Sequence, residues 1–135
     1  MKPRLSVFTG RETKLNKAIF QVLATEGALT IYEISKKVRT QISLRYNKYS
    51  VINRRVRSLS DKGYIEAISA RTTQAGFQAQ LYQLTLRAYL AITLSKIDLD
   101  RFIEEASEKN IINALTSITP LLDEGYNLTP NPKFL

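Results

Sequence analysis

The sequence contains no cysteine and no histidine. This absence excludes disulfide bonds, thiolate nucleophiles, Ser/His/Asp triads and the usual zinc sites, which all need one of these side chains. Any metal would have to be held by carboxylates alone, so no metal and no cofactor are predicted. No apolar run approaches the roughly 18 residues that span a bilayer, and the N-terminus lacks the long apolar segment of a secretory signal. We therefore expect a soluble cytoplasmic protein without a membrane partner.

Negative charge is scarce in the first half of the chain. Residues 1–63 carry 14 Lys and Arg against 4 Asp and Glu, a net charge of +10, whereas residues 87–135 carry 5 against 7, a net charge of −2. The whole chain of 135 residues has a net charge of +8 and is 44% hydrophobic, enough for one ordinary core. The asymmetry indicates that the N-terminal half binds a polyanion while the C-terminal half serves another purpose.

Two amphipathic helices are predicted in the first 40 residues. The first begins at a capping box formed by Thr9 and Glu12 and ends at Gly27. The second begins at a capping box formed by Thr30 and Glu33 and lasts only about two turns, so it depends on tertiary packing. The apolar stripes of the two helices are Leu15, Ala18, Ile19, Val22 and Leu23, and then Ile31, Ile34 and Val38.

A third helix is expected from about residue 48 to residue 62, with Asn47 as its N-cap and Gly63 after its end. A helical wheel at about 100° per residue gives a buried face that consists of Tyr49, Ile52, Val56 and Leu59. The opposite face carries Ser50, Arg54 and Arg57, with Asn53 on one flank. Arg55 lies on the other flank, where its stem runs along the edge of the core and its charge reaches outward.

The period changes from helical to extended after Gly63. Residues 64–69 and 80–85 are rich in strand formers, and the polar segment between them predicts a hairpin with a loop of about ten residues. Thr85 then caps another helix. The residues of this helix that are expected to pack are Leu86, Tyr89 and Leu90, with Leu94 as a further candidate.

A single longer helix is expected from about residue 98. It is followed by an irregular tail from about residue 119, which contains Pro120, Pro130 and Pro132. The stripe of this helix holds more apolar surface than one small domain needs to close its core. Its members are Leu99, Phe102, Ile103, Ala106, Ile111, Leu115 and Ile118, and all of them except Ala106 are candidate dimerisation residues.

Three segments together resemble the winged helix-turn-helix DNA-binding proteins of the transcriptional regulator type. They are "TIYEISKKV" (30–38), "SVINRRVRSLSDKGYI" (50–65) and "LYQLT" (81–85), and the resemblance covers residues 13 to about 94. It implies an α+β, mainly helical fold, with a three-helix core, a β-hairpin wing and additional C-terminal helices. The expected domains are a DNA-binding domain over residues 1–95 and a helical, dimerising extension over residues 96–135. The segment 40–47 is longer than the 3–4 residues usual between the two helices of this motif.

The resemblance also implies which residues face DNA. The matching positions of the recognition helix are Lys48, Ser50, Asn53, Arg54 and Arg57. The arginines can bind guanine in a bidentate manner, Asn53 can bind adenine, and Lys48 can meet a phosphate. Contacts to the DNA backbone are expected from Lys36, Lys37 and Arg45, with Arg71 as the candidate in the wing. The alternative is that these side chains only form a solvated face; the charge asymmetry and the resemblance favour sequence-specific binding of double-stranded DNA.

The C-terminal stripe has two interpretations. It forms a homodimer interface, as in several families that this chain resembles, or it folds back on its own domain. A homodimer would place two recognition helices, residues 48–62, over half-sites about one duplex turn apart. An effector pocket would leave no trace in the sequence.

Two other functions compete with DNA binding. A winged helix also serves as a protein-interaction module of a larger complex, but such a module has no need of Arg54 and Arg57 on one exposed face. A magnesium-dependent nuclease would need the acids between residues 98 and 108, which lie at a helix start and on a solvent face, where acids are ordinary. We therefore do not expect an enzyme.

Overall fold

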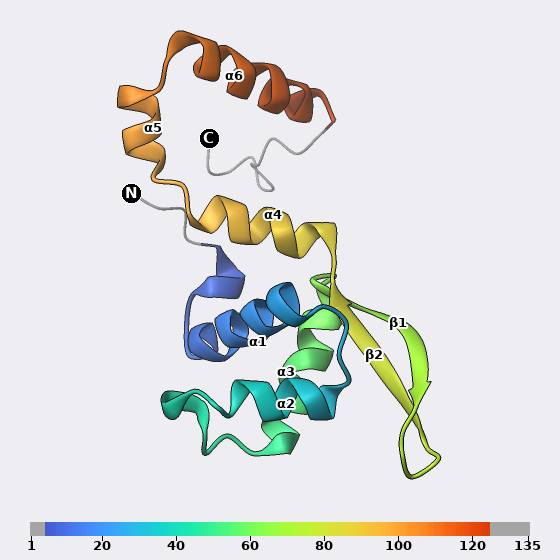
Figure 1. Cartoon of the computed structure of the whole chain (residues 1–135). Coiled ribbons are helices and arrows are strands. Elements are labelled where there is room, and N and C mark those ends of the chain that lie inside the picture. Colours follow the sequence, from blue (N-terminus) through green and yellow to red (C-terminus); the bar gives the residue numbers. More distant parts are fainter. Residues whose placement is uncertain (1–4, 125–135) are drawn as a thin grey trace, which may run out of the picture. The chain divides into compact units, whose positions relative to one another are not determined.

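The computed structural model of the chain describes residues 5–124, which fall into two compact units, one ending at Ile97 and the other beginning at Asp98. In the first unit, the helices within residues 13–61 pack together, and a hairpin projects from them (Figure 1). Within the described part of the chain, no helix is long and apolar enough to cross a membrane. The elements of the first unit are η1 (Ser6–Phe8), α1 (Thr13–Glu26), α2 (Ile31–Val38), η2 (Ile42–Leu44), α3 (Tyr49–Asp61), β1 (Ile65–Thr72), β2 (Gln78–Leu84) and α4 (Leu86–Ser95).

Helix α1 ends as predicted but begins differently. The predicted capping box is wrong, because α1 begins at Thr13, and Thr9 instead ends the short helix η1, where its Oγ1 donates to the carbonyl of Ser6. Glu12 is itself the N-cap and makes no side-chain capping bond. At the other end, Gly27 has a φ of 85°, which glycine adopts without steric cost. The predicted apolar stripe is buried, and Phe20 is buried beside it.

The capping box that begins α2 is confirmed. Thr30 Oγ1 accepts a hydrogen bond from the backbone N–H of Glu33 at 3.1 Å, and Glu33 Oε1 accepts one from the backbone N–H of Thr30 at 3.0 Å. The predicted core residues of this helix are buried: Ile31, Ile34 and Val38. Burial against the core stabilises a helix of 8 residues that is too short to persist alone.

Helix α3 is anchored by three residues with no exposed surface, which are Ile52, Val56 and Leu59, as predicted. Two details of the prediction are wrong. The N-cap is Lys48, because the Nδ2 of Asn47 instead donates to the carbonyl of Leu44 at 3.2 Å in the preceding turn. Tyr49 is 42% exposed rather than buried, since the first turn of α3 extends past the edge of the core.

Strands β1 and β2 form one antiparallel hairpin with a shorter loop than predicted. Thr72 lies opposite Gln78, so the turn comprises residues 73–77 rather than about ten residues. The outer part of each strand is exposed to solvent and polar in sequence. The sequence therefore predicted these residues to be part of the loop. A bulge lies between Ala67 and Ala70. The paired backbone carries the hairpin out from the helices as a wing.

Helix α4 packs with a different face from the predicted one. Thr85 caps it as predicted, by accepting a hydrogen bond from the backbone N–H of Ala88 at 3.3 Å. The residues that are buried are the small Ala88 and Ala91, which let the helix backbone approach the core closely. The residues that were predicted to pack are exposed instead: Leu86 at 88%, Tyr89 at 47% and Leu90 at 60%.

The second unit contains two helices where one was predicted, α5 (Leu99–Glu105) and α6 (Glu108–Asp123). Ala106 leaves the helical conformation with a ψ of 148°. Ser107 then caps α6 by accepting a hydrogen bond from the backbone N–H of Asn110 at 3.2 Å. A serine side chain stabilises a new helix start at the expense of continuing the previous helix, and the apolar periodicity does not reveal this.

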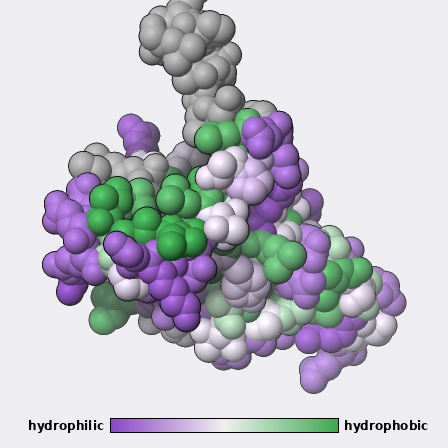
Figure 2. All heavy atoms as spheres, turned by 90° about the horizontal axis from the view of Figure 1, so that it is seen from above, coloured by the Kyte–Doolittle hydropathy of each residue, from purple (hydrophilic) through white to green (hydrophobic). Residues whose placement is uncertain are grey.

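Helix α6 also runs past the predicted start of the tail. It includes Pro120 and ends at Asp123. The remainder of the predicted tail, with Pro130 and Pro132, lies outside the described residues. Neither α5 nor α6 contains a buried residue; Ile103, for example, is 69% exposed and Leu115 is 59% exposed. In the view from above, Figure 2 shows hydrophobic side chains gathered at the surface among hydrophilic ones.

Candidate nucleic-acid interface

The candidate interface lies in a stretch of the chain without acids. Residues 34–60 contain 8 Lys and Arg and no Asp or Glu. The stretch includes most of α2, the turn 40–47 and most of α3, and all of its cations are exposed except Arg39 and Arg55. Two of these cations, Lys37 and Arg55, lie beside Glu26 and Glu12 from outside the stretch. The stretch itself contains no carboxylate and keeps a net positive charge, which can attract a polyanion.

One face of α3 is polar and accessible. Ser50, Arg54 and Arg57 are exposed opposite the buried face, and Asn53 is half-buried on its flank, as the wheel predicted. Arg57 Nε donates a hydrogen bond to Asn53 Oδ1 at 3.1 Å. Among residues 5–124, no side-chain hydrogen bond or ion pair engages Lys48, Ser50 or Arg54. These three side chains can therefore bind a partner without losing an internal contact.

A cleft of about 790 Å³ lies between the starts of α2 and α3 and the wing. Of the predicted DNA-binding residues, it brings together Lys36, Arg57 and Arg71. The predicted residues that do not line it are Lys37, Arg45, Lys48, Ser50, Asn53 and Arg54. Glu33 is the one acid among the lining residues, so three cations and one anion face the same space. The cleft is therefore electropositive.

Two tyrosines in the cleft were missed as candidate site residues. Tyr32 is exposed on α2 and its ring centroid lies 5.6 Å from Lys36 Nζ. Tyr49 lines the same cleft from the start of α3. Tyrosine offers both an aromatic ring and a hydroxyl to a polar partner. The outward position of Tyr32 follows from the apolar stripe of α2, which points the other way, but the exposure of Tyr49 depends on where the core ends.

The wing is tied to α2 by an ion pair. Arg71 Nη2 lies 2.7 Å from Glu33 Oε1, the same oxygen that accepts the capping hydrogen bond from Thr30. The hydrogen bond from the Thr30 backbone, and then that from Arg71, lower the pKa of Glu33 below its ordinary value of 4.5, although burial acts in the opposite direction. The carboxylate is thus ionised at neutral pH and fixes Arg71 at the edge of the cleft.

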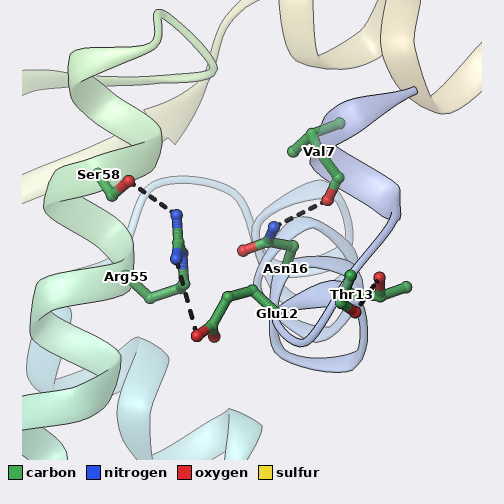
Figure 3. Close-up of polar contacts among 7 residues, drawn as sticks. Val7, Glu12, Thr13, Asn16, Arg55 and Ser58 are labelled. Carbon is green, nitrogen blue, oxygen red and sulfur yellow. Dashed lines mark hydrogen bonds and ion pairs between the residues drawn. The ribbon is translucent and has the colours of Figure 1, made fainter.

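Arg55 belongs to the edge of the core and not to this interface. Its Nη2 donates to Ser58 Oγ at 2.7 Å, and its Nη1 lies 4.0 Å from Glu12 Oε1. Figure 3 shows the guanidinium between these two partners; a separate hydrogen bond in the same view joins Asn16 Nδ2, the donor, to the carbonyl of Val7 at 2.8 Å. The side chain is only 17% exposed. The wheel's prediction that Arg55 lies along the core is confirmed.

The turn 40–47 is folded and presents a cation. Leu44 is buried and anchors the turn to the core. Arg45 is exposed, with its guanidinium 4.8 Å from the ring centroid of Tyr46. On the neighbouring helix, Lys37 Nζ lies 3.4 Å from Glu26 Oε1 at the surface. Exposed pairs of this kind are weak, so both cations remain able to bind phosphates.

The acids of the second unit support helices. Asp98 caps α5 by accepting a hydrogen bond from the backbone N–H of Arg101 at 3.2 Å, and Arg101 Nε donates to Glu105 at 2.8 Å. In the part of the chain that the structure describes, no group of three acids lies close enough to hold a metal ion.

Comparison with solved structures finds the same fold in two Bacillus subtilis proteins. The crystal structure of diamide-treated YodB is similar with a TM-score of 0.51 and 16% identity, over 76% of this chain and 88% of the other. PadR in complex with operator DNA is similar with a TM-score of 0.51 and 18% identity, over 91% and 81% of the two chains. The sequence matches no protein-family model and no curated protein. Together with the three-helix core and hairpin, these likenesses confirm the predicted winged-helix fold.

Proposed function

We propose that this winged-helix protein binds double-stranded DNA in a sequence-specific manner and regulates transcription. The observation that carries the proposal is the exposed Arg54 and Arg57 pair on α3, within a stretch of 27 residues, 34–60, that has no acid. The PadR structure, which has the same fold, is a complex with operator DNA. That likeness supports a nucleic-acid partner over a protein partner for this face.

The recognition helix enters the major groove, which is wide enough to admit an α-helix. Its buried side is fixed by the core, so its polar side must face the base edges. Arg54 and Arg57 can donate to guanine, and Asn53 lies half-buried on the flank of their face. Lys48 and Ser50, at the start of the helix, are placed to contact phosphates.

Cations outside α3 neutralise the DNA backbone. Arg45 lies in the anchored turn that leads into the helix, and Lys37 lies on α2. Lys36 and Arg71 line the cleft beside the wing. These contacts determine register and orientation, whereas the side chains of α3 supply the sequence preference.

We also propose that the protein acts as a homodimer through α5 and α6. Both helices are capped and regular, yet neither contains a buried residue, and apolar side chains such as Ile103 and Leu115 are exposed. Short helices in water depend on packing of an apolar face, and a second copy offers the same face in return. Two copies then present paired recognition helices to a palindromic operator.

The decisive experiment measures binding to random duplex DNA by fluorescence anisotropy at several salt concentrations. Neutralising about six phosphates gives a slope of log K against log salt of about −5. We expect the binding constant to fall with this slope between 50 and 200 mM salt, because each cation that contacts a phosphate releases a bound counterion. Weak binding that does not respond to salt would contradict the proposal and favour a protein-interaction module.

A further inference from the structure

Beyond its apolar base in the core, the wing makes few polar contacts with the helices among the described residues. Near its base, Leu29 and Tyr82 exchange two backbone hydrogen bonds, of 3.0 and 2.8 Å. Farther out, the ion pair between Arg71 and Glu33 joins the wing to α2. Arg71 lies opposite Ala79, one pair from the end of the ladder. Among the described residues, this ion pair is the outermost polar contact between the wing and the helices.

Glu33 is an unusually fixed anchor for a surface acid. Its Oε1 accepts hydrogen bonds from the backbone N–H of Thr30 at 3.0 Å, from Thr30 Oγ1 at 3.1 Å and from Arg71 Nη2 at 2.7 Å. The capping box therefore holds the carboxylate in place whether or not the wing is present. An isolated exposed pair must order two flexible side chains, but here one of the two is already ordered.

Arg71 keeps donors available for a second partner. A guanidinium has five N–H donors, and the side chain of Arg71 is 50% exposed. It lines the same cleft as Lys36 and Arg57. A phosphate in that cleft can therefore accept from Arg71 while the bond to Glu33 persists.

We infer that Glu33 is a positioning residue for nucleic acid: acting through Arg71, it holds the wing across the cleft at a fixed distance from α3. This inference rests on the proposed DNA binding. It predicts that loss of an acid lowers the affinity for DNA. Glu33 is an anion beside a polyanion site, so charge alone predicts that its removal tightens DNA binding, whereas positioning predicts that removal weakens it.

The variant Glu33→Gln separates these effects. Glutamine at this position of a capping box also reaches back to the N-cap amide, so α2 keeps its start while the charge is lost. Glu26→Gln is the matched control, because it removes the same charge from an exposed pair with Lys37 that lies outside the cleft. We expect E33Q to bind duplex DNA about threefold more weakly than wild type, and E26Q to bind at least as tightly as wild type.

The second part of the test is a double-mutant cycle. At 0.1 M salt, loss of one phosphate contact with a slope of about 0.9 makes binding roughly eightfold weaker, which is the expected effect of Arg71→Gln. The double variant E33Q/R71Q should bind no more weakly than R71Q, because Glu33 acts through Arg71. Arg71 lies on the exposed part of β1, so R71Q leaves the capping box intact. Its effect on DNA affinity can therefore be measured even if E33Q fails to fold.

A DNA-free readout completes the design. Amide hydrogen exchange in the wing turn, residues 73–77, should be faster in E33Q than in E26Q. E33Q binding as tightly as wild type, or full additivity with R71Q, would overturn the inference while leaving DNA binding intact. Absence of salt-dependent binding by the wild type would instead overturn the proposed function, and unchanged exchange in the wing would then also exclude the positioning role.

Discussion

Arg57 and Asn53 are joined on the exposed face of α3, where Arg57 Nε donates a hydrogen bond to Asn53 Oδ1 at 3.1 Å. The sequence assigned each residue to a base of its own, because arginine suits guanine and asparagine suits adenine. Bidentate binding to adenine needs Asn53 Oδ1 as an acceptor, so the base would have to share that oxygen with Arg57, whose hydrogen bond also fixes the direction of the amide. We infer that Asn53 orients Arg57 rather than reading an independent base.

A double-mutant cycle tests this relationship. Arg57→Ala should weaken binding to a duplex selected from a random pool by about 1–3 kcal/mol, as for a residue that contacts a base. Asn53→Ala should weaken it less, and the double variant should bind no more weakly than R57A, since the two residues act as one unit. Affinities from anisotropy at one salt concentration suffice. Additive losses would show that Asn53 makes its own contact.

The combined variant Arg54→Ala/Arg57→Ala tests the recognition face as a whole. Loss of two arginines that contact bases should weaken binding to a selected duplex at least tenfold at 0.1 M salt. Arg101→Ala is the control, because it removes an exposed arginine from α5. If a folded R54A/R57A protein binds DNA with unchanged affinity, the DNA-binding site must lie on a surface other than this face of α3.

Neighbouring arginines on α3 should have opposite roles. Arg55→Met removes the hydrogen bond to Ser58 but keeps the buried stem, so the free energy of unfolding should fall by about 1 kcal/mol while DNA affinity stays the same. Arg54→Met should leave stability unchanged and weaken DNA binding. Urea unfolding and anisotropy on both variants measure the two effects. Loss of affinity in a stable R55M protein would contradict the assignment of Arg55 to the core edge.

The capping carboxylate should make stability depend on pH. The pKa of Glu33 is lower in the folded protein than its ordinary value of 4.5, so the unfolded chain takes up the proton first as the pH falls. The stabilisation is therefore fully present above pH 4.5 and is lost as the pH falls through the lower folded value. Urea unfolding of wild type and E33Q between pH 7 and pH 3 should show a stability difference that shrinks in acid. A difference independent of pH would refute this role.

Charges on the exposed apolar face of α5 and α6 should prevent dimerisation. Ile103→Lys/Leu115→Lys should give monomers in light scattering, whereas the wild type should give about twice the chain mass of 15.4 kDa. Both residues are exposed in the single chain, so the substitutions spare its core. Ile42→Lys is the control, since it charges an exposed apolar residue in the first unit. A wild-type monomer would favour the fold-back interpretation.

Local patterns predicted the elements whose determinants lie within a few residues of each other. The capping box at Thr30 and the simple cap at Thr85 involve partners three residues away, and the sequence located both. Large apolar residues at helical spacing located the buried faces of α1, α2 and α3, and hence the outward direction of Arg54 and Arg57. Prediction failed where two local solutions compete, as at Thr9, which bonds within η1, and at Ser107, which divides the C-terminal helix.

The sequence by itself determined the basic first half and the polar face of α3, because charge and periodicity are properties of the chain. The winged-helix fold was indicated by the resemblance that residues 30–38, 50–65 and 81–85 carry. Only the tertiary structure decided which face of α4 is buried, since close approach through Ala88 and Ala91 outweighs the larger leucines. It also decided the pairing of Glu33 with Arg71, residues far apart in the chain that meet only when the wing folds beside α2. Such contacts depend on the path of the backbone through space, which no short window of sequence contains.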